Sequence, residues 1–195
     1  MATDPSKKQA RSALRARRRD IAARRDTGAD SRALADRVEQ FVGTLGLQPG
    51  QSVTSYAAVP GEPPTAELNA RLAAHGIRVL LPVTEADLDL DWHDAADASA
   101  SRLGKDAIGG VALVLAPGLA VDTRRTRMGQ GGGCYDKALP RRAPGVPVVV
   151  LLHPGELGEE PLPHAPHDVP VDLVLTADAL HDLRPGSHRA AMARD

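Results

Sequence analysis

The chain has 195 residues, of which 42% are hydrophobic and 2% aromatic, and its formal net charge is -1 at pH 7. This length suits one α/β domain whose core is built from Ala, Val and Leu, and the near-zero charge argues against a protein that coats nucleic acid over its whole surface. The single cysteine, Cys134, excludes an intramolecular disulfide and is typical of a reducing compartment. No apolar run reaches about 18 residues and no secretory h-region follows Met1, so we expect a cytoplasmic protein without a membrane span.

Two helices are predicted at the start of the chain. The first covers residues 6–25, where nine lysines and arginines accompany one acid, Asp20, and most of its arginines are expected on a solvated face. The second covers residues 31–46, where apolar residues at i, i+4, i+7, i+8 and i+11 predict one buried face. Those residues are Leu34, Val38, Phe41, Val42 and Leu45. A third helix is expected to follow an N-cap at Thr65 and to end at Gly76.

Strands alternate with these helices. A short strand is expected within residues 51–59, followed by a buried strand at 77–83, a possible edge strand at 88–92 and a loop at 93–110. The nearly all-apolar runs 111–117 and 146–152 predict strands buried on both faces of a parallel sheet, with a short helix near 134–142 and a last strand at 171–176. The order predicts a three-layer α/β sandwich with a mostly parallel central sheet, forming one domain over residues 1–183, with a flexible tail over 184–195.

The glycine-rich segment RMGQGGGCYDKAL, residues 127–139, matches neither common nucleotide motif. A Walker A loop requires Lys and Ser or Thr after its last glycine, but Cys134 follows Gly133. A dinucleotide fingerprint follows a strand directly, whereas the preceding predicted strand ends near Pro117.

The same segment still favours an anion. Successive glycines can turn their N–H groups toward a phosphate, and Arg127 can add a bidentate charge. Asp136 would repel a phosphate unless Mg²⁺ lies between them, which one or two carboxylates plus phosphate oxygens can hold. The alternative is a flexible surface loop with an aspartate at the start of a helix.

Residues 115–139 resemble the signature of the 5-formyltetrahydrofolate cyclo-ligase (5,10-methenyltetrahydrofolate synthetase) family. The matching residues are Pro117, Gly118 and Asp122, then Arg127, Gly129, Gly131, Gly133, Tyr135 and Asp136. The resemblance extends to Lys7 and Arg11 in the basic helix, to Glu62 and Thr65, and to Asp168 before the last strand. It implies a three-layer α/β fold and an ATP- and Mg²⁺-dependent ligase that closes 5-formyltetrahydrofolate to 5,10-methenyltetrahydrofolate.

The resemblance also implies roles for individual residues. Asp136 and Asp168 would hold Mg²⁺, Glu62 and Tyr135 would contact the folate, and Arg127 and Asp136 would be catalytic. The ATP-binding residues would be Lys7, Arg11, Arg127, Met128, Gly129, Gln130, Gly131, Gly132, Gly133, Cys134 and Tyr135. The formyl oxygen would attack the γ-phosphate, and N10 would then displace phosphate from the activated carbon. Because Lys7 and Arg11 are i and i+4, we expect the basic helix to pack across the glycine segment.

Two positions and one segment depart from the family pattern. Cys134 stands where a tyrosine is frequent, Gln130 stands where a basic residue is common, and residues 93–110 lack a Glu-Pro step that helps to shape the folate pocket. One alternative is therefore an ATP-dependent enzyme of the same fold with a different acceptor. Another is a nucleotide- or nucleic-acid-binding module that uses the basic helix. The leading interpretation is a cytoplasmic monomer acting on ATP and a reduced folate, without membrane or nucleic acid.

Overall fold

A computed structural model describes residues 5–186, so most of the predicted tail lies outside the described residues. The helices are α1 (Pro5–Ala22), α2 (Thr27–Leu45), α3 (Ala66–Ala74) and α4 (Cys134–Ala138), with 3₁₀ turns η1 (Lys105–Gly110) and η2 (Leu139–Arg141). The strands are β1 (Ser52–Thr54), β2 (Arg78–Thr84), β3 (Leu90–Asp94), β4 (Leu113–Pro117), β5 (Ala120–Asp122), β6 (Arg127–Met128), β7 (Val148–Leu151), β8 (Leu157–Gly158), β9 (Leu173–Leu175) and β10 (Leu180–Asp182).

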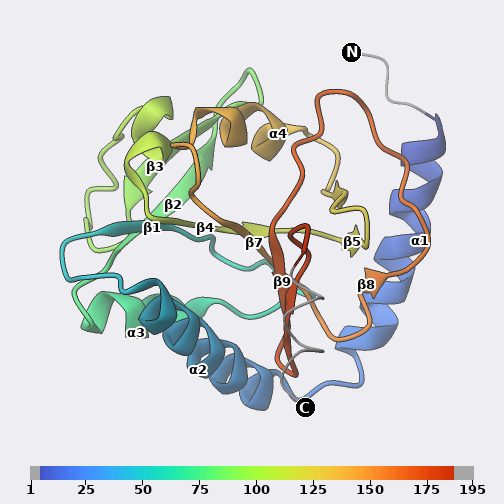
Figure 1. Ribbon diagram of the computed structural model, residues 1–195, viewed down its shortest axis with the longest axis horizontal. Helices are drawn as coiled ribbons and strands as arrows, with labels where there is room; N and C mark the ends of the chain where they lie inside the picture. Colours follow the sequence, from blue (N-terminus) through green and yellow to red (C-terminus); the bar gives the residue numbers. More distant parts are fainter. Residues whose placement is uncertain (1–4, 187–195) are drawn as a thin grey trace.

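The main sheet has seven strands in the order β10-β9-β7-β4-β1-β2-β3 (Figure 1). The five central strands, β9 to β2, are parallel, and the two edge strands pair antiparallel with their neighbours. This arrangement confirms the mostly parallel sheet and the edge position of the strand predicted near 88–92. A second sheet, in the order β6-β5-β8, leads into the glycine segment.

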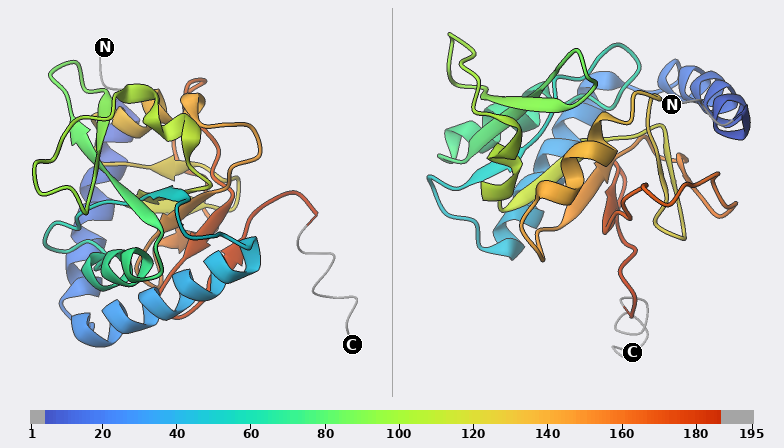
Figure 2. Two further views of the ribbon diagram at one scale, coloured as in Figure 1. Left: turned by 90° about the vertical axis from the view of Figure 1, so that its left-hand side faces the viewer. Right: turned by 90° about the horizontal axis from the view of Figure 1, so that it is seen from above.

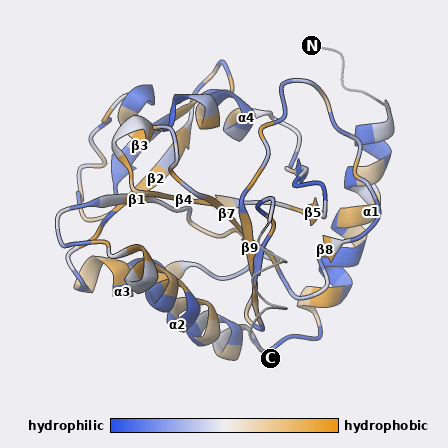
Figure 3. Ribbon diagram, in the orientation of Figure 1, coloured by the Kyte–Doolittle hydropathy of each residue, from blue (hydrophilic) through white to orange (hydrophobic). Residues whose placement is uncertain are grey.

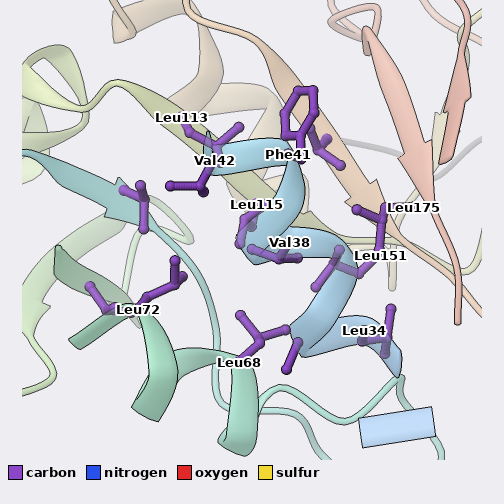
Figure 4. Packing of buried hydrophobic residues seen from close by; sticks show 14 of the residues in the cluster. Leu34, Val38, Phe41, Val42, Leu68, Leu72, Leu113, Leu115, Leu151 and Leu175 are labelled. Carbon is purple, nitrogen blue, oxygen red and sulfur yellow. The ribbon is translucent and has the colours of Figure 1, made fainter. Parts of the chain in front are cut away.

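Side chains of a strand alternate between the two faces of a sheet. Both faces of the main sheet therefore carry apolar side chains, and a separate layer packs on each. On one face Leu113 and Leu115 of β4 pack with α2 and α3, and Figure 4 shows this cluster with Leu68 and Leu72 of α3. On the other face Val114 packs in a cluster with Trp92 and with residues of α4 and η2. Figure 3 shows the hydrophobic residues concentrated along the central strands. The three-layer prediction is thereby confirmed.

Helix α1 lies beside the small sheet, at one end of the main sheet (Figures 1 and 2). The segment that follows β8 runs back along α1 and brings residues near 168 beside the start of that helix (Figure 1). No helix within residues 5–186 combines the length and the apolar character needed to cross a bilayer.

Several local predictions require correction. Helix α2 begins at Thr27, earlier than expected, because the Asp26 side chain caps it by accepting from the amides of Gly28 and Ala29. Thr65 precedes α3 as expected, but its hydroxyl donates to the Tyr56 carbonyl instead of capping the helix.

Two further predictions were partly wrong. Leu45, placed on the buried face of α2, is 38% exposed because it lies in the last turn. The segment 93–110, expected to be a loop, contains the end of β3 and the turn η1, whose Ile108 is fully buried. One buried side chain per turn is too sparse a pattern to identify a short 3₁₀ segment.

Candidate active site

One cavity lies at the carboxyl ends of β2 and β4, beside the point where the strand order reverses. Successive strands extend outward in opposite directions from β1 and β4, and open α/β sheets place their ligands in the crevice at such a point. The volume of the cavity is about 200 Å³. It is lined by Lys7, Arg11, Glu62, Pro82, Thr84, Leu90, Asp168 and residues 117–118 and 127–136. All the site residues expected from the sequence therefore line this one cavity.

The glycine segment connects β6 to α4 and forms one wall of the cavity. Gly131 has a φ of +118°, which side chains rarely adopt, and a Cβ at this position would lie 3.5 Å from Nε of Arg11. Glycine at this position therefore permits the turn, and the turn lies in contact with Arg11 of α1.

The prediction that the basic helix packs across the glycine segment is confirmed. Arg11 Nε donates to the Gly129 carbonyl at 3.2 Å, although the two residues are 118 positions apart. One turn further along α1, Arg15 donates to the side chain and the carbonyl of Gln130 at 3.1 and 2.6 Å. Sequence reasoning missed the place of Arg15, although its spacing of four from Arg11 was a usable signal.

Arg127 is almost buried and forms an ion pair within the cavity. Its Nη2 donates to Oδ1 of Asp136 at 2.8 Å, and its Nη1 donates to the Pro117 carbonyl at 3.3 Å. Its guanidinium also lies over the ring of Tyr135, 5.4 Å from the centroid, which is a cation–π distance. The Arg127 side chain is 4% exposed, so its charge is screened less by water than that of a surface arginine.

A second ion pair joins Lys7 at the start of α1 to Asp168, at 2.5 Å between Nζ and Oδ2. The Ala165 amide donates to the same carboxylate at 2.7 Å. Burial acts to raise the pKa of Asp168, but the hydrogen bonds from Lys7 and Ala165 outweigh it and leave that pKa below its ordinary value. Asp168 is therefore ionised at neutral pH.

The remaining wall of the cavity is less polar. It is formed by Pro82, Leu90, Pro117 and the ring of Tyr135, and Thr84 and Glu62 also line the cavity. Burial raises the pKa of the Tyr135 hydroxyl, so the phenol is neutral and can donate a hydrogen bond. Trp92 does not line the cavity: it is fully buried and contacts Tyr135 edge to face, with ring centroids 6.4 Å apart.

Asp136 and Asp168 line the cavity with three cations, Lys7, Arg11 and Arg127. Within residues 5–186, no group of three or more His, Cys, Asp or Glu side chains could hold a metal ion by itself. Two carboxylates in one cavity are nevertheless oxygen donors of the kind that Mg²⁺ accepts, because water and other oxygen ligands can complete its shell.

Two other residues of the basic helix and the family signature lie outside the cavity. Asp122 is fully buried and accepts from the amides of Arg124, Thr126 and Leu162, so it fixes the turn before the glycine segment. Arg18, expected on the solvated face of the basic helix, is instead 5% exposed. No residue of 93–110, where the Glu-Pro step is missing, lines the cavity. Pro82 and Thr84 of β2 and Leu90 of β3 line it instead.

Comparison with known proteins assigns the chain to a family. A profile of the 5-formyltetrahydrofolate cyclo-ligase family matches residues 3–177. A curated 5-formyltetrahydrofolate cyclo-ligase from Mycolicibacterium smegmatis is 34% identical over 144 residues, which are 65% of this chain and 74% of that protein.

Two solved structures share the fold. A 5,10-methenyltetrahydrofolate synthetase from Mycoplasma pneumoniae has a TM-score of 0.71 at 17% identity, covering 86% of this chain and 98% of its own. The same enzyme from Aquifex aeolicus has a TM-score of 0.67 at 19% identity, covering 90% of this chain and 94% of its own. The chain therefore belongs to the 5-formyltetrahydrofolate cyclo-ligase family and is a ligase.

Proposed function

We propose that this cavity uses ATP and Mg²⁺ to close 5-formyltetrahydrofolate to 5,10-methenyltetrahydrofolate. Membership of the family and the curated relative support the cyclo-ligase activity itself. The observation that carries the rest is the convergence of two cations of α1, the glycine segment, two aspartates and Glu62 on one cavity. These groups come from opposite ends of the chain, and a flexible surface loop would not gather them.

The polar half of the cavity suits a triphosphate. Lys7, Arg11 and Arg127 supply three positive charges, and the glycine segment supplies backbone N–H groups without side chains that block approach. In the free protein Lys7 and Arg127 are each paired with an aspartate. When the nucleotide binds, both cations would exchange that carboxylate for phosphate oxygens, so no buried charge would lose its partner.

The two aspartates released by this exchange would then hold Mg²⁺. Asp136 and Asp168 offer the carboxylate oxygens that this ion prefers beside phosphate. When bound, Mg²⁺ neutralises charge that develops on the phosphate oxygens.

The less polar half of the cavity suits the pterin of a reduced folate. Pro82, Leu90 and the ring of Tyr135 offer apolar surface, and the Glu62 carboxylate offers an acceptor. The volume of about 200 Å³ is enough for the reacting groups but not for two whole substrates. The adenosine and glutamate ends would therefore extend outside it.

The chemistry proceeds in two displacements. The formyl oxygen attacks the γ-phosphorus and ADP leaves, which gives an imidate-like phosphate ester on the carbon bound to N5. N10 then attacks that carbon and gives up its proton to the phosphate, the carbon–oxygen bond breaks, and inorganic phosphate leaves with the former formyl oxygen. Phosphoryl transfer depends mainly on positioning and on charge neutralisation. Arg127, which is withdrawn from water, would stabilise the negative charge on the transferred group, and Lys7 and Arg11 would hold the rest of the triphosphate.

The test mixes the protein with ATP, Mg²⁺ and 5-formyltetrahydrofolate and follows the methenyl product by its near-ultraviolet absorbance. Arg127→Ala and Asp136→Asn should lose most of the turnover, because each removes a charge from the reacting centre. Arg17→Ala is the matched control, since Arg17 is an exposed arginine of α1 that does not line the cavity. Consumption of ATP without the methenyl product would instead indicate a different acceptor, and no reaction of either kind would refute the proposal.

A labelled substrate tests the order of the bond changes. With ¹⁸O in the formyl group, the released phosphate should carry the label, because the formyl oxygen leaves with phosphorus. Unlabelled phosphate accompanying the methenyl product would rule out phosphoryl transfer to the formyl oxygen.

A further inference from the structure

Arg18 joins α1 to Gly118, which lines the cavity, and to Glu156, which lies outside it. It lies on the same face of α1 as Lys7 and Arg11, because positions 7, 11 and 18 fall within one stripe of a helix with 3.6 residues per turn. Its Nε and Nη2 donate to the two carboxylate oxygens of Glu156 at 2.6 and 2.7 Å. Nη2 also donates to the carbonyl of Gly118, which lines the cavity next to the carbonyl that Arg127 contacts.

The same contacts continue to the turn that carries Glu62, another residue that lines the cavity. Oε2 of Glu156 accepts a hydrogen bond from the backbone amide of His153 at 2.8 Å. Nε2 of His153 lies 3.1 Å from the carbonyl of Gly61, the residue directly before Glu62. Arg18, Glu156 and His153 are all at most 5% exposed, so these bonds form in a low-dielectric environment that strengthens them.

From these contacts we infer that Arg18, Glu156 and His153 act together as positioning residues. The inference rests on the function proposed above. Arg18 fixes α1, and so the cations of α1, relative to the turn at Gly118 and to Arg127. His153 extends the same hydrogen-bonded chain to the turn that presents Glu62. The three residues would therefore hold the triphosphate side and the folate side of the cavity in one geometry without touching either substrate.

This inference makes a prediction that separates the two substrates. His153→Leu removes only the bond to Gly61, so it should raise the KM for 5-formyltetrahydrofolate and leave the KM for ATP unchanged. The double variant Arg18→Met with Glu156→Leu removes both charges and frees α1 as well, so both KM values should rise. We expect about a tenfold rise in each case, since displacement of a binding group by about an ångström has effects of this order or larger.

The double variant also separates positioning from stability. Removing both partners of a buried ion pair leaves no unpaired charge, so the melting temperature of the double variant should exceed that of Arg18→Met alone. Hydrogen exchange at residues 58–64 should be faster than in the wild type for both the double variant and His153→Leu, a readout that needs no turnover. Arg17→Met, on the exposed side of the same helix, is the control and should match the wild type.

The outcomes can be told apart. Wild-type KM values in a folded double variant would overturn the inference, because the ion pair would then serve stability only. If the double variant does not fold, an unchanged folate KM in His153→Leu overturns it instead. Absence of methenyl formation by the wild type counts against the proposed function, whereas unchanged exchange at residues 58–64 in a folded variant counts against the positioning role.

Discussion

Gly129→Ala should damage the site by displacing Arg127 while removing no functional group. A Cβ on Gly129 would lie 2.8 Å from Nη1 of Arg127, whereas an ordinary contact begins at 3.4 Å. Gly129 does not have a positive φ, so the backbone itself accepts alanine. Because the obstacle is the end of a flexible side chain, the guanidinium must move by at least about 0.6 Å to restore an ordinary contact.

A shift of this size would stretch the hydrogen bond from Arg127 to the Pro117 carbonyl, which is already 3.3 Å long, past its useful range. A hydrogen bond from a charged donor contributes about 1.5–3 kcal/mol to folding stability, so the melting temperature should fall by several degrees. Because misplacement of a group at the reacting centre by about an ångström costs up to about a hundredfold in rate, we also expect kcat/KM for ATP to fall by about tenfold or more.

The assay is the initial rate of methenyl formation at varied ATP. Gly110→Ala is the control, because its Cβ would meet no atom within 4 Å and Gly110 lies outside the cavity. If Gly129→Ala keeps the wild-type kcat/KM for ATP, the position of Arg127 is unimportant and the reasoning is wrong.

Three further predictions concern stability. Leu115→Ala should lower the free energy of unfolding by about 2–5 kcal/mol in a urea titration, since Leu115 is fully buried under α2; a loss well below this range would contradict the packing. Gly43→Ala should raise that free energy by about 0.5–1 kcal/mol, because Gly43 is in α2 and its Cβ would meet nothing; a loss of stability would contradict this. The lowered pKa of Asp168 means that its carboxylate adds stability above its unfolded pKa of about 3.9. That contribution is lost as pH falls through the lower folded pKa, so the stability gap between wild type and Asp168→Asn should narrow as the pH falls below the unfolded value; an unchanged gap would contradict it.

The parts of the fold that the sequence predicted are those where one pattern persists over several residues. The apolar runs 111–117 and 146–152 became β4 and β7, since a strand covered on both faces has no polar side. Strands β5, β6, β8 and β10 have two or three residues each. An alternation of apolar and polar residues cannot be recognised over so short a stretch. Their positions are set by partners elsewhere, such as Val121 of β5 pairing with Leu157 of β8.

The residues in and around the cavity also divide into those that the sequence predicted and those that it did not. Motif residues such as Arg127 and Asp136 could be found because they stand together in one segment. Arg18 could not, because an arginine in a basic helix is usually solvated and its partner Glu156 is 138 positions away. Spacing from Lys7 and Arg11 is compatible with a shared helix face, but only the folded chain shows that Glu156 and the Gly118 carbonyl lie within hydrogen-bond distance of Arg18.

If cations of α1 bind the triphosphate, calorimetric titration of ATP with Mg²⁺ in the absence of folate will measure their contribution. Arg11→Ala should weaken nucleotide binding by about tenfold to a hundredfold, the value of one charge-assisted contact. Arg17→Ala, which changes an exposed arginine of the same helix, should bind like the wild type. Equal affinities for all three proteins would contradict the account, because α1 would then have no part in holding the nucleotide.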